Sequence, residues 1–313
     1  MNNDLTRSWS SVTRRTALAG LGAGSLGLAA TLGLGSRLGH VAAQESTPCS
    51  PATPAAWGQT ATVNGADLYY EIHGPADGHP VLLLHGGLGN AEWWTNQSPV
   101  LAAAGRRVVA MDSRGHGRST WGDTPLTVVP QMGVDVLGLL DHLGIAQTDV
   151  VGWSDGAVIA LDLAIHHPER LGRVVAYGAN VTPDGVHALV PSDQLLPFER
   201  IAADYQRLSP EPGRFEELVA TLDALYKVAP NFSETDLRSI TVPVLVLDGA
   251  EEEFIKPEHT RRLAELIPGS ELLLMPGTGH FTPFSEPGAF NRIVLAFLAG
   301  EAVGTPTAAT PTS

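Results

Sequence analysis

Residues 149–167 read DVVGWSDGAVIALDLAIHH, and this stretch decides the fold that we expect. Its first residues form a short apolar run of the kind that makes a buried strand. Residues 152–156 (GWSDG) match the pattern G-x-S-x-G, and residues 157–167 are apolar almost all round, as in a buried helix. The stretch therefore predicts a strand, a tight turn with a serine at its centre, and a helix packed behind a sheet.

The turn gives Ser154 a candidate chemical role. A strand-to-helix turn this tight strains the backbone of its middle residue, and Gly152 and Gly156 avoid clashes that side chains would cause there. The serine hydroxyl is then held at the carboxyl edge of the sheet, where open α/β sheets bind ligands. We interpret Ser154 as a nucleophile; the alternative is a serine that only caps the helix.

Short apolar runs alternate with helical patterns along most of the chain. The runs are mostly continuous in apolar character, as in strands of a parallel sheet that is covered on both faces. Strand–helix alternation predicts an α/β fold with a doubly wound, mostly parallel sheet. The predicted strands are 67–73, 80–84, 107–111, 149–151, 173–177, 243–247 and 271–275, and the predicted helices are 134–143, 157–167, 257–267 and 288–298.

Residues from about 180 to 240 break this rhythm. They carry no strand signal, and residues 215–226 place apolar side chains at i, i+3 and i+4, as in an amphipathic helix. We therefore expect a helical cap inserted between two strands, covering a site and shaping its pocket.

Two further loops at the same edge of the sheet supply catalytic candidates. A serine hydroxyl needs a base, and His280 follows the last predicted strand in a glycine-rich loop. Residues 85–89 (HGGLG) follow the strand 80–84. We expect the N–H of Gly87, together with that of Asp155, to form an oxyanion hole for a carbonyl oxygen that gains negative charge.

A carboxylate is expected to hold the imidazole in the right tautomer. The loop after the strand 243–247 offers Asp248, Glu251, Glu252 and Glu253. Residue types and spacing leave these four acids open.

The termini are predicted to lie outside the catalytic domain. Arg14 and Arg15 precede an uncharged run over residues 16–36, and Val41-Ala42-Ala43 follows. Residues 1–43 resemble a twin-arginine export signal cleaved near Ala43, which predicts a periplasmic or extracellular protein without a stable membrane anchor. The alternative is a chain tethered to the membrane by an uncleaved signal. Residues 44–58 and 301–313 have the composition of a flexible linker and a disordered tail.

Charge and cysteine content exclude several classes. The formal net charge is −14, and beyond residue 43 the chain holds 15 basic and 32 acidic residues. Such a body repels nucleic acid, so we expect a small-molecule substrate and no nucleic-acid partner. Cys49 is the sole cysteine, which rules out a disulfide within the chain and a cysteine-based metal site.

These motifs, in this order, resemble the α/β-hydrolase superfamily over residues 59–300. The resemblance rests on HGGLG (85–89), DSRGHGRS (112–119), GWSDG (152–156), the cap, the loop 249–252 and GHF (279–281). It implies Ser154, a carboxylate and His280 as nucleophile, acid and base. The family usually has Asp three residues after the glycine that ends the acid-bearing strand, and Glu252 stands there instead. The segment 112–119 is implied to be mainly a structural turn.

Residues 153–156 and 177–180 resemble the branch that contains valacyclovir-hydrolase-like esterases and non-haem haloperoxidase or lactonase relatives. In the first of these, the acid after the serine helps to bind a substrate ammonium group, which would give Asp155 that role; the alternative is that Asp155 only caps the helix. The pocket lining is assigned to Trp94, together with Trp93 and His187.

The resemblance implies a serine hydrolase that cleaves a small carboxylic ester or lactone through an acyl-enzyme, with no metal or organic cofactor. The alternatives are a perhydrolase or haloperoxidase-like enzyme, a carbon–carbon bond hydrolase on the same triad, or a non-catalytic binding protein of this fold. The sequence names no substrate and no oligomeric state.

Overall fold

The computed structural model describes residues 58–187 and 198–303. Within them, one sheet has the strand order β1-β2-β4-β3-β5-β6-β7-β8. The pairs β1–β2 and β2–β4 are antiparallel, and the other pairs are parallel. The strands are β1 (Gly58–Val63), β2 (Ala66–His73), β3 (Pro80–Leu84), β4 (Arg107–Met111), β5 (Thr148–Trp153), β6 (Leu171–Tyr177), β7 (Val244–Gly249) and β8 (Glu271–Met275).

The predicted α/β class with a mostly parallel sheet is confirmed. Three predicted strands, β3, β4 and β8, have the expected bounds, and four others differ by one or two residues at one or both ends. Strand β1 was not predicted. It pairs with β2 across a turn at Asn64 and Gly65, both with positive φ. The predicted export signal, most of the linker and the tail beyond residue 303 lie outside the described residues.

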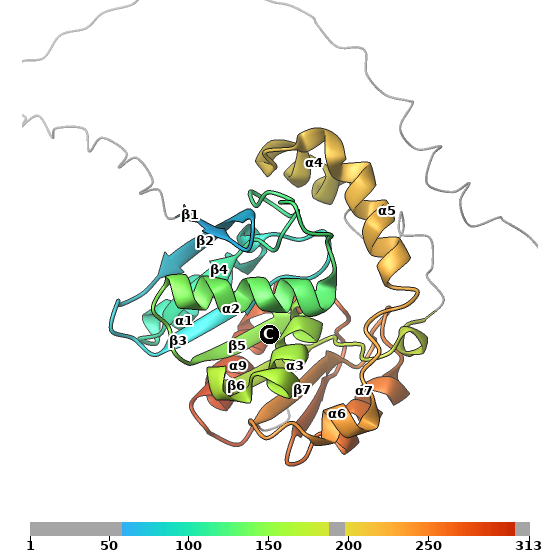
Figure 1. Ribbon diagram of the computed structural model, residues 1–313. Coiled ribbons are helices and arrows are strands. Elements are labelled where there is room, and N and C mark those ends of the chain that lie inside the picture. The colour runs from blue at the N-terminus through green and yellow to red at the C-terminus, as the bar shows by residue number, and fades with distance from the viewer. Residues whose placement is uncertain (1–57, 188–197, 304–313) are drawn as a thin grey trace, which may run out of the picture. The chain divides into compact units, whose positions relative to one another are not determined.

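Apolar side chains on the two faces of the sheet form two separate cores. Val150 of β5 belongs to one core and Val151 to the other, because successive side chains of a strand point to opposite faces. Helices α2 and α3 cover one face, visible in front of the sheet in Figure 1, and α1 and α9 cover the other. The helices outside the cap are α1 (Ser98–Ala103), α2 (Gly133–His142), α3 (Asp155–His166), α7 (Pro257–Leu266), α8 (Thr282–Ser285) and α9 (Pro287–Leu298).

The cap lies in the chain between β6 and β7, as expected. Its described helices are α4 (Phe198–Leu208), α5 (Phe215–Leu225) and α6 (Glu234–Arg238). Leu218 and Leu222 of α5 are buried, which confirms the predicted amphipathic pattern. In the described residues, no helix combines the length and the apolar character that a membrane span requires.

A buried ion pair joins three parts of the domain. Arg114, in the loop after β4, donates from Nε and Nη2 to the two carboxylate oxygens of Asp135 on α2, at 2.7 and 2.8 Å. Its remaining hydrogen bonds go to the carbonyl oxygens of Asn64 and Trp121, each at 3.0 Å. Both charged side chains are almost completely buried. Removing one partner leaves the other charge without compensation, which is more costly than losing an exposed pair.

We therefore predict that Arg114→Met lowers the free energy of unfolding by about 3–5 kcal/mol. The matched control is Arg238→Met, which breaks an exposed pair with Glu234 on α6. The control should leave stability nearly unchanged, because water solvates both charges. Urea unfolding of the two variants measures the difference, and equal losses would contradict the role assigned to Arg114.

Candidate active site

Ser154 occupies the turn between β5 and α3 with a strained backbone. Its φ is 56° and its ψ is −120°, and few non-glycine residues adopt a positive φ. Its N–H donates to the carbonyl oxygen of Tyr177 at the end of β6, at 2.8 Å. No side-chain hydrogen bond from Ser154 caps α3. The hydroxyl is thus not used as a helix cap, and its side chain is only partly buried.

The two glycines of the turn are required by close backbone contacts. A Cβ on Gly156 would lie 2.0 Å from the carbonyl oxygen of Leu84 in β3, and one on Gly152 would lie 2.3 Å from the carbonyl oxygen of Gly156. Distances this short to backbone atoms cannot be relieved by moving a side chain. The glycines thus allow α3 to begin directly against the sheet.

His280 and Glu252 form a buried pair at the same edge. Nδ1 of His280, in the loop after β8, lies 2.9 Å from Oε1 and 3.1 Å from Oε2 of Glu252. Oε1 also accepts from the N–H groups of Phe254 and Ile255. Burial opposes ionisation of Glu252, but the facing imidazole and the hydrogen bonds to the carboxylate lower its pKa to about 2.

The other three acids of this loop have different environments. Glu253 accepts a hydrogen bond from the backbone N–H of His280 at 2.7 Å, and its side chain does not reach the ring. Asp248 is buried and accepts from the N–H of Gly249 and the hydroxyl of Thr260. Glu251 is exposed. Among the four candidates, Glu252 is the acid whose carboxylate contacts the imidazole.

Ser154 and His280 are brought to neighbouring positions. Nε1 of Trp153 donates to the carbonyl oxygen of His280 at 2.8 Å, and the two rings are 5.7 Å apart. The Ser154 N–H donates to Tyr177, and Gly178 is the next residue. A Cβ on Gly178 would lie 2.9 Å from the imidazole of His280. Within the described residues, the hydroxyl of Ser154 makes no hydrogen bond to the imidazole of His280. Such bonds are often long in a free site and tighten when substrate binds.

The glycine loop after β3 packs against the serine turn. A Cβ on Gly86 would lie 3.0 Å from Cβ of Ser154, and one on Gly87 would lie 2.8 Å from a carboxylate oxygen of Asp155. Within the described residues, the N–H groups of Gly87 and Asp155 donate no hydrogen bond. Two unused backbone donors therefore lie close to the nucleophile candidate.

A tyrosine of the cap reaches this site, and the sequence did not reveal it. The hydroxyl of Tyr226, just after α5, donates to Asp155 at 2.7 Å, and a Cβ on Gly87 would lie 2.1 Å from that hydroxyl oxygen. Burial raises the pKa of Asp155 to about 6, although the hydrogen bond from Tyr226 and the charge of His280 oppose the rise. The periodic pattern placed Tyr226 on a buried helix face but gave no sign of its partner.

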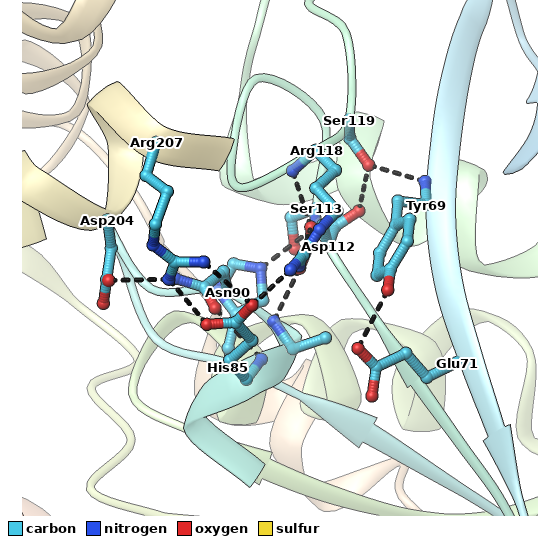
Figure 2. Close-up of polar contacts among 12 residues, drawn as sticks. Tyr69, Glu71, His85, Asn90, Asp112, Ser113, Arg118, Ser119, Asp204 and Arg207 are labelled. Carbon is cyan, nitrogen blue, oxygen red and sulfur yellow. Dashed lines mark hydrogen bonds and ion pairs between the residues drawn. The ribbon is translucent and has the colours of Figure 1, made fainter. Parts of the chain in front are cut away.

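The segment after β4 holds the glycine loop in place (Figure 2). Asp112 is fully buried and accepts from the N–H groups of Ala91 and Arg118, at 2.5 and 2.6 Å. Nε2 of His85 accepts from the N–H of Ser113 at 2.9 Å. Burial raises the pKa of Asp112 to about 7, against the effect of these hydrogen bonds. The side chains of Asp112 and His85 are therefore used in hydrogen bonds within this part of the domain.

One carboxylate links this segment to the cap. Glu92, in the short helix η1 (Ala91–Trp94) after the glycine loop, binds Arg118. It also accepts from both terminal nitrogens of Arg207 on α4, at 2.6 and 3.2 Å. Figure 2 shows Arg207 facing this network beside its second partner, Asp204. The cap is thus bound to the core through charge as well as through apolar contacts.

Trp94, which was assigned to the pocket lining from the sequence, lies in a core of the domain. Its side chain is 1% exposed and packs against Phe290 of α9, in the core on one face of the sheet. Trp93 is also buried, but it stacks on Trp153, with ring centroids 5.3 Å apart. Two adjacent tryptophans look alike in the sequence, and the turn of η1 decides which of them stacks on Trp153, the residue before Ser154.

Comparison with known proteins agrees with the resemblance to α/β hydrolases. The model of the alpha/beta hydrolase family matches residues 81–293. A protein of Caulobacter sp. (strain K31) that carries the name carbamate hydrolase RutD is 34% identical over 269 residues, covering 78% of this chain and 99% of its own length. The 2-hydroxymuconate semialdehyde hydrolase of Pseudomonas putida is 31% identical over 255 residues, covering 73% and 90%.

Solved structures show the same fold. The enol-lactonase from Burkholderia xenovorans LB400 superposes with a TM-score of 0.61 at 26% identity, covering 77% of this chain and 100% of its own. The family model spans well over half of the chain, and the first relative matches over nearly its whole length. The chain belongs to the alpha/beta hydrolase family.

Proposed function

We propose that this protein is a serine hydrolase that cleaves a small carboxylic ester or lactone through an acyl-enzyme. The observation that carries the proposal is the buried His280–Glu252 pair beside Ser154. A carboxylate on Nδ1 keeps the proton there and leaves Nε2 free to accept the serine proton. Helix α3 begins at the same turn, and its positive end favours negative charge near the serine.

The proposed reaction has two stages, acylation of Ser154 and hydrolysis of the acyl-enzyme. As Ser154 Oγ attacks the carbonyl carbon, its proton passes to His280, and the carbonyl π electrons move to the oxygen. The oxyanion accepts hydrogen bonds from the N–H groups of Gly87 and Asp155. When the C–O bond breaks, His280 returns the proton to the leaving alkoxide. Water then attacks the acyl-enzyme by the same route and releases the acid.

Asp155 gives the site a means to select among esters. Its carboxylate lies next to the oxyanion donors and is held by Tyr226 of the cap. A substrate ammonium group placed there would share the carboxylate with the tyrosine hydroxyl. The net negative charge of the chain also attracts cations. We therefore infer a preference for esters that carry a positive charge.

Other reactions on the same residues remain alternatives. One relative carries the name 2-hydroxymuconate semialdehyde hydrolase, and another, from Streptomyces lividans, carries the name non-heme chloroperoxidase. A relative named for carbamate hydrolysis makes a carbamate a necessary member of any substrate screen. A screen of esters, lactones, carbamates and peroxide-dependent halogenation separates these reactions. A non-catalytic binding protein would show none of them.

We predict that Ser154→Ala abolishes labelling by a fluorophosphonate probe and lowers kcat/KM for the best ester by roughly 10⁴- to 10⁶-fold. The control, Ser239→Ala, removes an exposed hydroxyl at the end of α6 and should label like the wild type. A wild-type protein that never labels would instead favour a binding role.

A second series separates the three glutamates among the four candidate acids. Glu252→Gln removes the charge that holds Nδ1–H and should lower kcat by about 10²- to 10⁴-fold. Glu251→Gln alters an exposed neighbour and should have little effect. Glu253→Gln keeps an oxygen acceptor for the His280 N–H, so its effect should be small. Steady-state kinetics of the three proteins decides, and a larger loss at Glu251 or Glu253 would shift the role to that residue.

The charge of Asp155 predicts a pH-dependent preference. Because burial raises its pKa to about 6, the carboxyl is neutral below that pH and negative above it. The ratio of kcat/KM for a choline ester to that for its uncharged dimethylbutyl counterpart should rise about tenfold as pH increases through this value. Asp155→Asn should remove both the preference and its pH dependence. A ratio that does not change with pH in the wild type argues against ammonium binding here.

A further inference from the structure

A hollow of about 360 Å³ lies at the edge of the sheet opposite the serine. Its lining includes Asp149 at the amino end of β5, Arg173 near the amino end of β6, and Leu298 at the end of α9. Ser154 and His280 follow the carboxyl ends of β5 and β8, so the hollow is separate from the candidate active site. Its volume lies within the range of small-molecule sites, which begins at about 300 Å³.

The basic side chains of the hollow are arranged around Asp149, which is 3% exposed. Its Oδ1 accepts from the backbone N–H of Arg173 at 2.8 Å. Its Oδ2 lies 3.1 Å from Nη1 of Arg106 and 3.2 Å from Nε2 of His79. A Cβ on Gly172 would lie 2.4 Å from Oδ1, so glycine leaves the carboxylate the room that it needs. The contacts within the protein therefore fix the position of this acid.

The two arginines of the hollow differ in the donors that they have left. Arg106 donates from Nη1 to Asp149 and from Nη2 to the carbonyl oxygen of Leu298, the latter at 2.7 Å. The guanidinium of Arg173 lies over the ring of Phe297, with Cζ 5.6 Å from the ring centroid. In residues 58–187 and 198–303, this guanidinium has no hydrogen-bond acceptor and no ion-pair partner. An aromatic ring thus supports a planar set of unused donors in the wall of the hollow.

The local charge of the hollow is opposite in sign to that of the chain. Arg106 and Arg173 outweigh Asp149 by one positive charge, and His79 adds another when it is protonated. In the described part of the chain, Asp149 is the one acid of the lining. Beyond residue 43 the chain holds 32 acidic and 15 basic residues. A shortage of acids therefore does not explain why the guanidinium of Arg173 is unpaired.

We propose that the hollow binds a small molecule through a carboxylate or phosphate group, and that Arg173 is the main residue that holds this group. The planar guanidinium can donate two parallel hydrogen bonds to two oxygens of either group. Arg106 adds positive charge nearby. Asp149 acts in the opposite direction, because its charge repels a bound anion. This site is independent of the proposed serine-hydrolase function.

The experiment measures the binding of inorganic phosphate and of succinate to the full chain by titration calorimetry and by the shift in Tm. A ligand that binds the folded state alone raises Tm. The ionic strength is held constant, so that screening of surface charges does not change. The variant is Arg173→Gln, and the matched control is Arg261→Gln. Arg261 is exposed on α7 and forms no ion pair in the described chain, so both variants change the net charge equally.

We expect Arg173→Gln to raise the Kd of the tighter-binding anion by about tenfold or more, the effect of losing charge-assisted hydrogen bonds. Arg261→Gln should bind like the wild type. The fold should tolerate Arg173→Gln, because this guanidinium has no ion pair to lose. Asp149→Asn provides a test of opposite sign. Its amide oxygen can still accept from the Arg173 N–H, and loss of the negative charge should lower Kd by about three- to tenfold.

Weaker binding in Arg173→Gln but not in Arg261→Gln supports the proposal, even if Asp149→Asn does not fold. The anion that binds more tightly then identifies the group that the hollow recognises, a phosphate or a carboxylate. A wild-type chain that binds neither anion at millimolar concentration overturns the proposal. Equal weakening in the two arginine variants also overturns it, because it shows a general attraction between charges and no site. A folded Asp149→Asn that binds more weakly than the wild type contradicts the assigned repulsion and overturns the site as described.

Discussion

The backbone of Gly156 meets the carbonyl oxygen of Leu84 so closely that there is no room for a methyl group between them. This contact joins the first turn of α3 to β3, and it leaves Ser154 at the tip of the turn with a positive φ. The glycine loop after β3 then lies directly beside the serine, because the strand that carries it is the one that α3 touches. The proposed nucleophile and the proposed oxyanion donors are thus brought together by a packing contact between a helix and a strand.

The electrostatics of the site follow from an excess of buried acid. Asp248, Glu252 and Asp155 are all buried at the carboxyl edge of the sheet, close to His280. In the proposed reaction, this excess of acid favours the imidazolium form of His280 and disfavours additional negative charge. Tyr226 of the cap donates a hydrogen bond to Asp155 and so stabilises one of these carboxyl groups.

Sequence reasoning predicted the parallel strands well because their apolar runs are continuous, but it missed β1, whose sequence (GQTATV) consists mostly of small and polar residues. It placed Ser154 and His280 at one edge because each follows a parallel strand. The order of motifs indicated Glu252, yet only the fold of the loop shows which acid reaches the ring. The sequence also does not show that Trp93 stacks on Trp153 while Trp94 packs against Phe290, because neighbouring residues in a short helix point in different directions. The contact between Tyr226 and Asp155 joins residues 71 positions apart and left no local signal.

His280 is carried by the loop after β8, which lies at the border of the described sheet and pairs with β7 alone. Ser154 follows β5, which has a partner on each side. Border strands open at lower free-energy cost than central ones. Mild heating should therefore detach the imidazole by sub-global opening while the centre of the sheet stays folded, so that reversible thermal inactivation precedes global melting.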